Sequence, residues 1–330
     1  MNSYRNSILA TIVYYDIFDY PLTLLEVFKY LINPGRVKRI TDGIAEITLN
    51  DIAEELDKLV KSKTISQKNG FYFLIGRESL YDIRIDRQKI ADQKWKKFLK
   101  IVRFLALAPY FRGAFASGSM ALGNTDDDSD FDVLVIVKAG RLYTSRLFMW
   151  LITSVMGVRR KKHERVAPDK LCFNHFITEN SLGLSHESLF NAQTYANLKP
   201  IMIEPGLIDR FFSSNLWINN FVYNFKVQKD FVRRSVVPSG LFIFCANLGE
   251  LILNSPLGDG FEKIAKNFQQ KKIKNNPATY ESGGRIVFND AELEFHPRSF
   301  ESTVVKKYNQ GIRKLGLIPY IEEKDSGLTS

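Results

Sequence analysis

The feature that most constrains the fold is the stretch GSMALGNTDDDSDFDVLVIV, residues 118–137, which joins a small-residue turn to an apolar strand containing carboxylates. Its end, FDVLVIV, is rich in β-branched residues and typical of a buried strand. A buried strand rarely tolerates unpaired carboxylates, because their desolvation is costly. Side chains alternate along a strand, so Asp130 and Asp132 are expected on one face. Two such charges repel unless a cation lies between them.

The turn before the strand has the properties of a phosphate site. Gly118 permits close approach of the backbone to a ligand, and we expect Ser119 to cap a short helix whose free amides attract phosphate. Mg²⁺ (or Mn²⁺) takes oxygen ligands and often binds few carboxylates plus substrate phosphates. The intervening Asp126, Asp127 and Asp128 favour a solvated polar turn. The stretch therefore predicts a site for a nucleotide and Mg²⁺.

These residues resemble the polymerase-β-type nucleotidyltransferase superfamily, and in particular its small, minimal members. The family pattern is a Gly-Ser pair, a spacer of roughly nine to thirteen residues, and Asp-apolar-Asp-apolar. Here Gly118-Ser119 is followed by ten residues and then Asp130-Phe131-Asp132-Val133. The resemblance covers residues 110–180. It implies that Gly118 and Ser119 bind the triphosphate of an NTP, and that Asp130 and Asp132 are catalytic and coordinate Mg²⁺.

Members of this family usually carry a third carboxylate on a later strand, and that position is not acidic here. The next expected strand is KLCFNHFIT, residues 170–178. Strict alternation would place Asn174 and His175 on opposite faces, with Asn174 at the expected acidic position. An amide oxygen can bind a metal but cannot act as a base. Three possibilities stay open: two carboxylates with a substrate-borne or histidine base, recruitment of Glu179, or nucleotide binding without efficient transfer.

The segment between these two strands contains further basic candidates. Residues 141–157 have helical spacing, and Arg141 and Arg146 at the start of this helix could reach nucleotide phosphates. The basic run 159–162 could contact an anionic substrate such as RNA, or be a solvated loop.

The first 77 residues predict a winged-helix-like domain. Capping boxes at Thr23–Glu26 and Thr48–Asp51 begin two helices after an apolar first helix, and Asn69-Gly70 predicts a two-stranded hairpin. The third helix, which would read DNA, is mostly acidic and would be repelled by phosphate. We therefore favour a protein-contact or scaffolding role and place DNA binding second.

The whole chain predicts an α+β protein. The expected order is a winged-helix-like domain, a linking helix, a nucleotidyltransferase core with a mixed α/β sheet, and a largely helical C-terminal region with one hairpin. In that last region, residues 185–203 are expected to be one helix that ends at Pro200. The boundaries of the four parts are 1–77, 78–106, 107–182 and 183–330.

The net charge and the number of cysteines limit which ligands and which cellular compartment we expect for this chain. The net charge is +10, and residues 1–76 hold nine basic and nine acidic residues, so the excess lies in the remainder and suits an anionic ligand. Two cysteines and a start without signal-peptide features favour the cytoplasm. The apolar runs 147–158 and 241–254 are expected to be buried helices rather than membrane spans.

Two functions follow as hypotheses. The first is an enzyme, a Mg²⁺-dependent nucleotidyltransferase that moves an NMP from an NTP to an unidentified hydroxyl of a small molecule, a protein or an RNA. The second is a nucleotide-binding regulatory or sensor protein, with a catalytically degenerate transferase domain and a winged-helix interaction module. A third acidic group near the aspartate pair would favour the enzyme, and its absence would favour the sensor.

Overall fold

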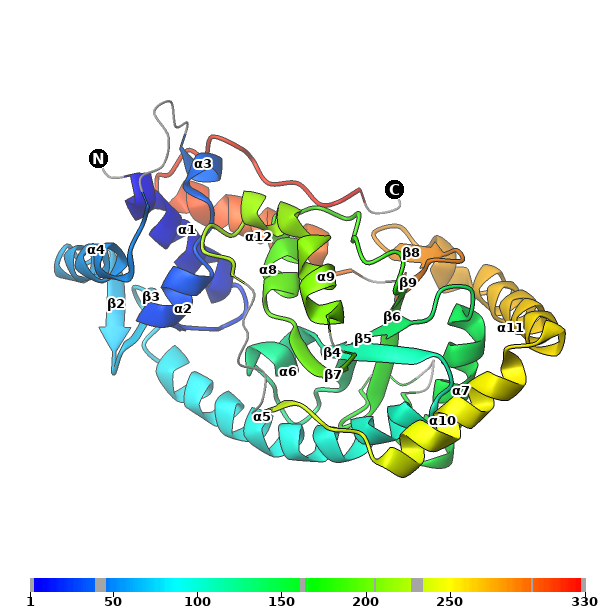
Figure 1. Ribbon diagram of the computed structural model, residues 1–330. Helices are drawn as coiled ribbons and strands as arrows, with labels where there is room; N and C mark the ends of the chain where they lie inside the picture. Colours follow the sequence, from blue (N-terminus) through cyan, green and yellow to red (C-terminus); the bar gives the residue numbers. More distant parts are fainter. Residues whose placement is uncertain are drawn as a thin grey trace.

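The computed structural model describes residues 3–38, 46–160, 164, 166–204, 206–226, 234–297 and 299–327. Helices and strands are mixed, as the sequence predicts (Figure 1). The strands form a small three-stranded sheet, in the order β1-β3-β2, and a six-stranded sheet, in the order β7-β4-β5-β6-β9-β8.

The N-terminal elements begin where local chemistry predicts. Thr23 and Thr48 both form complete capping boxes, with Glu26 and Asp51 respectively. Asn69 and Gly70 have positive φ angles of 51° and 83°, which allow the tight hairpin turn. The elements are α1 (Ser3–Asp16), β1 (Leu22–Thr23), α2 (Leu24–Lys29), α3 (Pro34–Val37), α4 (Leu49–Lys61), β2 (Ile65–Lys68) and β3 (Phe71–Leu74). The long helix α5 (Leu80–Val102) and the 3-10 helix η1 (Arg103–Leu107) lead into the large sheet.

The large sheet is mixed. Strand β5 pairs antiparallel with β4 and parallel with β6, while β9 pairs antiparallel with both β6 and β8. The strands are β4 (Phe111–Ala116), β5 (Phe131–Val137), β6 (Leu171–Thr178), β7 (Lys199–Ile203), β8 (Arg285–Phe288) and β9 (Glu292–His296). The short helix α6 (Gly118–Leu122) connects β4 to β5.

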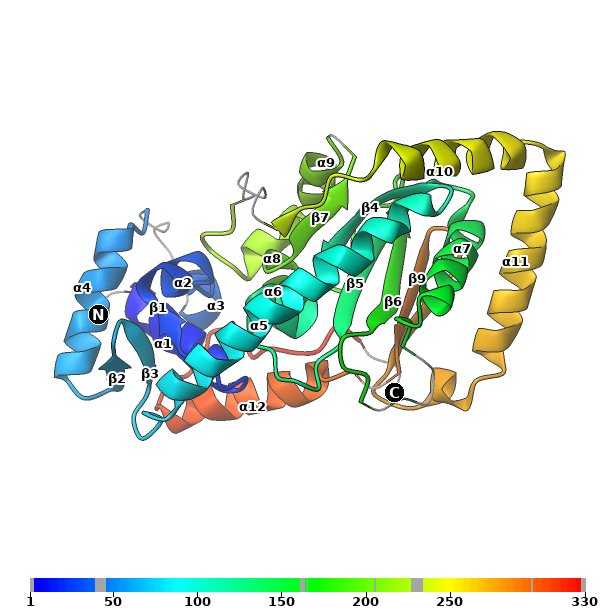
Figure 2. The same cartoon turned by 90° about the horizontal axis from the view of Figure 1, so that it is seen from below.

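Both faces of the large sheet are covered, and alternation along β5 sorts its side chains between two hydrophobic clusters. Val133 and Val135 pack with residues of α5, η1 and α7 (Leu142–Val155) on one face. Leu134 and Ile136 pack on the other face with residues of α8 (Leu189–Ala196), α9 (Leu207–Ser213), η2 (Leu216–Asn220) and α12 (Glu301–Lys314). Figures 1 and 2 show α5 and α8 on opposite sides of the sheet.

The expected helix over residues 185–203 is wrong in its second half. Helix α8 ends at Ala196, and residues 199–203 form β7 at the edge of the large sheet. Pro200 therefore lies within a strand instead of ending a helix. A proline lacks the N–H of a ladder hydrogen bond, and edge strands tolerate this. The C-terminal region thus adds three strands to the large sheet, since β8 and β9 also join it.

The N-terminal elements share a hydrophobic core with the large sheet. Ile8 and Val13 of α1 belong to the same buried cluster as Phe115 of β4 and Tyr308 of α12. Tyr14 lies against Tyr308, with ring centroids 6.2 Å apart. Residue 77 is therefore not a boundary between two separate hydrophobic cores.

Helices α10 (Gly240–Leu253) and α11 (Pro256–Lys274) form a bent arm along one side of the sheet (Figure 2). The expectation that residues 241–254 are a buried helix is wrong, because Leu241, Phe244 and Leu251 of α10 are exposed. Within the described residues, no single helix is long and apolar enough to cross a membrane, and only α10 and α11 together, bent by 98°, reach that length and composition.

Candidate functional site

The turn between β4 and α6 lies directly against the start of β5. The Ser117 amide donates a hydrogen bond to the Asp132 carbonyl oxygen over 3.0 Å. Gly118 has a φ of +64°, and a Cβ atom at this position would overlap with Asp132 Oδ2. The chain therefore needs glycine here both for its backbone conformation and for space.

Helix α6 begins two residues earlier than the sequence suggests. Ser117 is its N-cap residue, and its side chain makes no capping hydrogen bond. Ser119 lies inside the first turn, so the expectation that Ser119 caps this helix is wrong. Its position still leaves it next to Gly118 in the chain.

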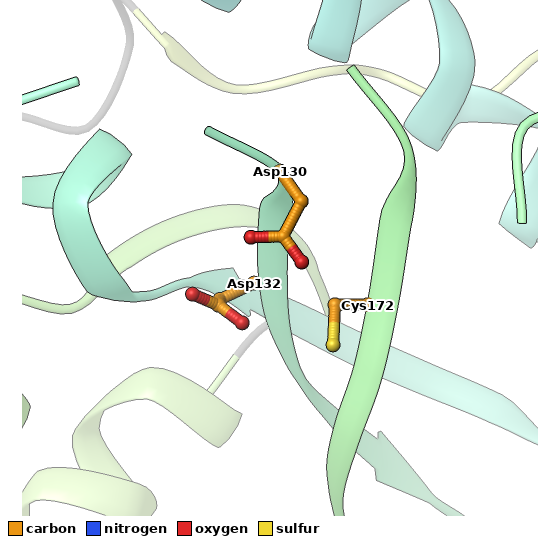
Figure 3. A group of neighbouring side chains, drawn as sticks. All are labelled: Asp130, Asp132 and Cys172. Carbon is orange, nitrogen blue, oxygen red and sulfur yellow. The ribbon is translucent and has the colours of Figure 1, made fainter. Parts of the chain in front are cut away.

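Asp130 and Asp132 lie on the same face, as strand alternation predicts. Figure 3 shows both carboxyl groups on one side of β5, together with the Cys172 thiol from β6. One oxygen of each carboxylate and the Cys172 Sγ atom all lie within 4.8 Å of one another. A single cation could contact both carboxylates at this separation.

The carboxyl group of Asp132 is strongly perturbed. Its burial raises its pKa to about 7, and repulsion from Asp130 adds to the rise. The Arg160 charge and hydrogen bonds from Asn174 and Cys172 act in the opposite direction but are outweighed. A carboxylate in this state is stabilised by any further cation that approaches it.

Arg160 is a site residue that the sequence did not single out. Its Nη1 atom donates to Asp130 Oδ2 over 2.5 Å, and its guanidinium also donates to the Glu164 carbonyl oxygen over 3.2 Å. The signal was present in the basic run 159–162, but only the fold shows which of its members faces the aspartates. Lys161 and Lys162 of that run lie outside the described residues.

A bulge in β6 decides which side chains face the aspartates. Asp132 pairs with Cys172, whereas Leu134 pairs with His175, so two residues of β6 lie opposite one of β5. Such a bulge breaks the alternation. Asn174 Nδ2 donates to Asp132 Oδ1 over 3.0 Å, and His175 shares the face of Leu134. Strict alternation, which separated Asn174 from His175, is therefore wrong for this strand.

The position expected to be acidic is filled by an amide and a thiol. Within the described residues, Cys172 is the only side chain that groups with Asp130 and Asp132 as a third potential metal ligand of the types histidine, cysteine, aspartate and glutamate. His175 is paired elsewhere, with its Nε2 atom 2.9 Å from Glu292 Oε1. Glu179 follows the far end of β6 and lies 3.4 Å from Arg112 Nε. The structure does not bring Glu179 to the aspartates.

The structure does not bring Arg141 and Arg146 to the aspartates either. Both follow the end of β5, whereas the aspartates lie at its beginning. Arg141 forms a 2.6 Å ion pair with Asp259. Arg146 is buried, donates to Gln269 Oε1 over 2.8 Å and lies 4.0 Å from the ring centroid of Trp150. Both arginines therefore connect the start of α7 to α11, close to the end of β5 that is far from the aspartates.

The loop that carries Asp130 is anchored by a buried lysine from α5. Lys94 Nζ donates to the carbonyl oxygens of Asp127 and Ser129 over 2.9 and 2.8 Å, and to Asp169 Oδ1 over 3.0 Å. The side chains of residues 126–128 remain exposed, as expected of a solvated turn. Lys94 thus holds the loop through its backbone carbonyl oxygens. The last of these belongs to Ser129, the residue directly before Asp130.

Comparison of the chain with models of known protein families, with curated proteins and with solved structures gives no match.

Proposed function

We propose that this chain is a nucleotidyltransferase that uses Mg²⁺ (or Mn²⁺) to move an NMP from an NTP to a hydroxyl acceptor. The observation that carries the proposal is the position of Gly118. The backbone of this turn touches the Asp132 carboxylate, and Asp130 lies on the same face. A phosphate at the turn and a cation at the carboxylates would therefore contact each other.

The donor set fits a hard divalent cation. Asp130 and Asp132 offer carboxylate oxygens, and Asn174 offers an amide oxygen if its side chain is rotated by half a turn. When bound, the ion offsets the charge that develops on the phosphates and orients the attacking and leaving oxygens. Binding of the ion also relieves the repulsion between the two carboxylates, which raises the pKa of Asp132.

Each residue has a defined role in the transfer. Asp130 and Asp132 would hold the cation that contacts the α-phosphate; the acceptor oxygen forms a bond to the α-phosphorus while the bond from that phosphorus to the oxygen that bridges to the β-phosphate breaks. Pyrophosphate leaves, and the acceptor proton passes to solvent, since no third carboxylate accompanies the pair within the described residues. Arg160, at the edge of the pair, is placed to exchange Asp130 for an anionic phosphate oxygen.

A second candidate function is nucleotide sensing without efficient transfer. The observation in its favour is the amide of Asn174, which donates to Asp132 where a third carboxylate would serve catalysis. A thiol at Cys172 does not replace it, because burial raises the pKa of this thiol above its usual range. Such a site could bind an NTP and a metal ion while lacking the group that deprotonates an acceptor.

We also propose that the N-terminal segment makes protein contacts rather than DNA contacts. On α4, Glu54 and Asp57 are exposed, and they offset the exposed Lys58 and Lys61. A face with this balance does not attract the phosphate backbone. The segment is also packed on α12 and the large sheet, so a partner bound there could influence the site.

The test measures binding and transfer separately. The full chain is incubated with each α-³²P-labelled NTP, Mg²⁺ and fractionated cell extract, and NTP binding is measured in parallel by equilibrium dialysis. The enzyme proposal expects labelled product and a loss of at least about 1,000-fold in the Asp130→Asn, Asp132→Asn variant. The matched control is Asp126→Asn, Asp127→Asn, which changes two exposed carboxylates of the adjacent loop and should keep full activity.

The outcomes separate the candidates. Labelled product that depends on Asp130 and Asp132 supports the enzyme. Metal-dependent NTP binding without product, lost in the same variant, supports the sensor. Absence of NTP binding in the unaltered chain contradicts both.

A further inference from the structure

A second polar group lies on the large sheet, where three of the four histidines of the chain surround one glutamate. His175 of β6 pairs in register with Glu294 of β9. His296 lies two residues further along β9, on the same face as Glu294. His186 comes from the segment between β6 and α8. Three stretches of the chain, β6, β9 and the segment before α8, thus contribute to one place.

The distances in this group suit ligands that share an ion. His186 Nε2 lies 3.7 Å from Glu294 Oε2, and His296 Nε2 lies 3.4 Å from Glu294 Oε1. Two ligands of a tetrahedral Zn²⁺ lie roughly 3.3–3.5 Å apart, because each is about 2.0–2.2 Å from the ion. Potential ligand atoms of His175, Glu292 and Glu294 all lie within 4.8 Å of one another.

Two atoms in the group are buried without a partner. Glu294 Oε2 and His186 Nε2 make no hydrogen bond within the described structure, and the Glu294 side chain is fully buried. A buried carboxylate oxygen without a partner costs free energy, and the imidazole nitrogen that faces it is too distant to donate to it. An atom bound between the two would satisfy both.

The charges of the group leave an excess of negative charge. Arg285 donates to Glu294 Oε1 over 2.6 Å and to Glu301 Oε2 over 3.0 Å, and it does not reach Glu294 Oε2. Glu294 and Glu301 thus share one guanidinium. A divalent cation would balance the group.

We propose that His175, Glu292 and Glu294 bind one Zn²⁺ ion per chain, and that His186, whose Nε2 atom lies 3.7 Å from Glu294 Oε2, closes on the ion as the fourth ligand. Neutral imidazole and carboxylate are ligands of Zn²⁺, whereas Mg²⁺ prefers oxygen alone. The ion would join β6, β9 and the segment before α8, and so fix the edge of the sheet to the helical layer. This site is separate from the aspartate pair, since His175 lies beside Leu134 rather than Asp132, and the proposal does not depend on nucleotide transfer.

The test measures metal binding by the full chain. The purified protein, without a histidine tag, is stripped with a chelator, and Zn²⁺ binding is followed by titration calorimetry and by elemental analysis after gel filtration. One equivalent of Zn²⁺ is expected. Co²⁺ in its place should give visible absorption of a tetrahedral ion without a thiolate charge-transfer band, which a site at Cys172 would show.

Variants assign the site. His186→Gln removes a side-chain nitrogen that has no hydrogen bond, so the fold should survive while Zn²⁺ affinity falls by at least about 10- to 100-fold. Glu294→Gln should lose the Zn²⁺ equivalent altogether. Cys172→Ser should retain it, and Glu179→Gln, which also alters a carboxylate beside an arginine, is the matched control. No binding by the unaltered chain, or unchanged affinity in His186→Gln, would overturn the proposal.

Discussion

Asp132 and Glu294 are carboxylates on strands of the same sheet, and their surroundings drive them in opposite directions. Burial and the neighbouring Asp130 raise the pKa of Asp132 to about 7. Burial also acts on Glu294, but His175, Arg285 and His296 outweigh it and lower the pKa of Glu294 to about 2.

The difference shows that burial alone does not fix the charge of a carboxylate. Glu294 has a guanidinium in direct contact, over 2.6 Å, while Asp132 has another carboxylate beside it and only the more distant influence of Arg160. Glu294 therefore contributes to stability as an anion, and Asp132 lowers stability as an anion. An unstable anion of this kind is suited to binding a cation.

The largest expected effect tests Glu294, the carboxylate whose charge is compensated by Arg285. Arg285→Met leaves Glu294 and Glu301 buried without their guanidinium, so unfolding in urea should show a loss of about 3–5 kcal/mol. The control is Arg141→Met, whose partner Asp259 is largely exposed, and it should change stability by less than about 1 kcal/mol. Equal losses of stability in Arg285→Met and Arg141→Met would contradict the conclusion that Glu294 depends on its buried guanidinium.

The next effect tests the close approach of the turn to the aspartates. Gly118→Ala should cost about 2–4 kcal/mol, because alanine is strained at positive φ and its methyl group overlaps with Asp132. Gly140→Ala has the same kind of φ, +75°, with no atom within 4 Å, and should cost only about 1–2 kcal/mol. Both are measured by chemical denaturation, and a cost at Gly118 no larger than at Gly140 would rule out the overlap.

A smaller change in stability, of opposite sign, is expected at Asp132, whose charge is not compensated. Because the pKa of Asp132 is higher in the folded chain than its ordinary 3.8, the folded state loses stability as pH rises from about 4 to about 7. Asp132→Asn removes that loss and should stabilise the metal-free protein by roughly 1–2 kcal/mol at pH 8.

At about pH 3 the same Asp132→Asn variant should nearly match the unaltered chain, since Asp132 is then mostly protonated in both the folded and the unfolded states. Glu294→Gln should instead destabilise the chain at pH 7. Melting curves of Asp132→Asn at low pH and at pH 8, and of Glu294→Gln at pH 7, check whether the two substitutions change stability in opposite directions. Destabilisation by Asp132→Asn at pH 8 would show that the Asp132 carboxylate is already compensated.

The smallest effect concerns proton release on metal binding. A cation at Asp132 must displace a proton below pH 7, so Mg²⁺ or Mn²⁺ should bind about tenfold more tightly at pH 8 than at pH 6. Titration calorimetry in two buffers of different ionisation enthalpy checks both the affinity and the released proton. A pH-independent affinity would place the ion elsewhere.

Much of the fold follows from local sequence. The capping boxes at Thr23 and Thr48, the Asn69-Gly70 turn and the apolar run 131–137 all specify their own structure, because their interactions span only a few residues. Residues 199–203 illustrate the limit. Their short apolar run continues a helical pattern, and only pairing with β4 makes them a strand.

The candidate site divides in the same way. Asp130, Asp132 and the Gly118 turn were predictable because spacing and alternation are local properties. Asn174 was also expected at the position that faces them, and it donates to Asp132. The bulge that brings His175 to the face of Leu134 was not predictable, since it arises from the fit of β6 to its neighbours. Arg160 was visible only as part of a basic run, and Lys94 only as one lysine of a long helix.

The sequence by itself determined that two carboxylates share one face of a strand beside a glycine turn, because side-chain alternation and positive φ are properties of the chain. The tertiary structure alone decided their surroundings: an amide and a thiol from β6, a guanidinium at Asp130, and, further along the sheet, three histidines around Glu294. Electrostatic environment depends on groups brought together from distant segments, and packing of the whole fold sets it.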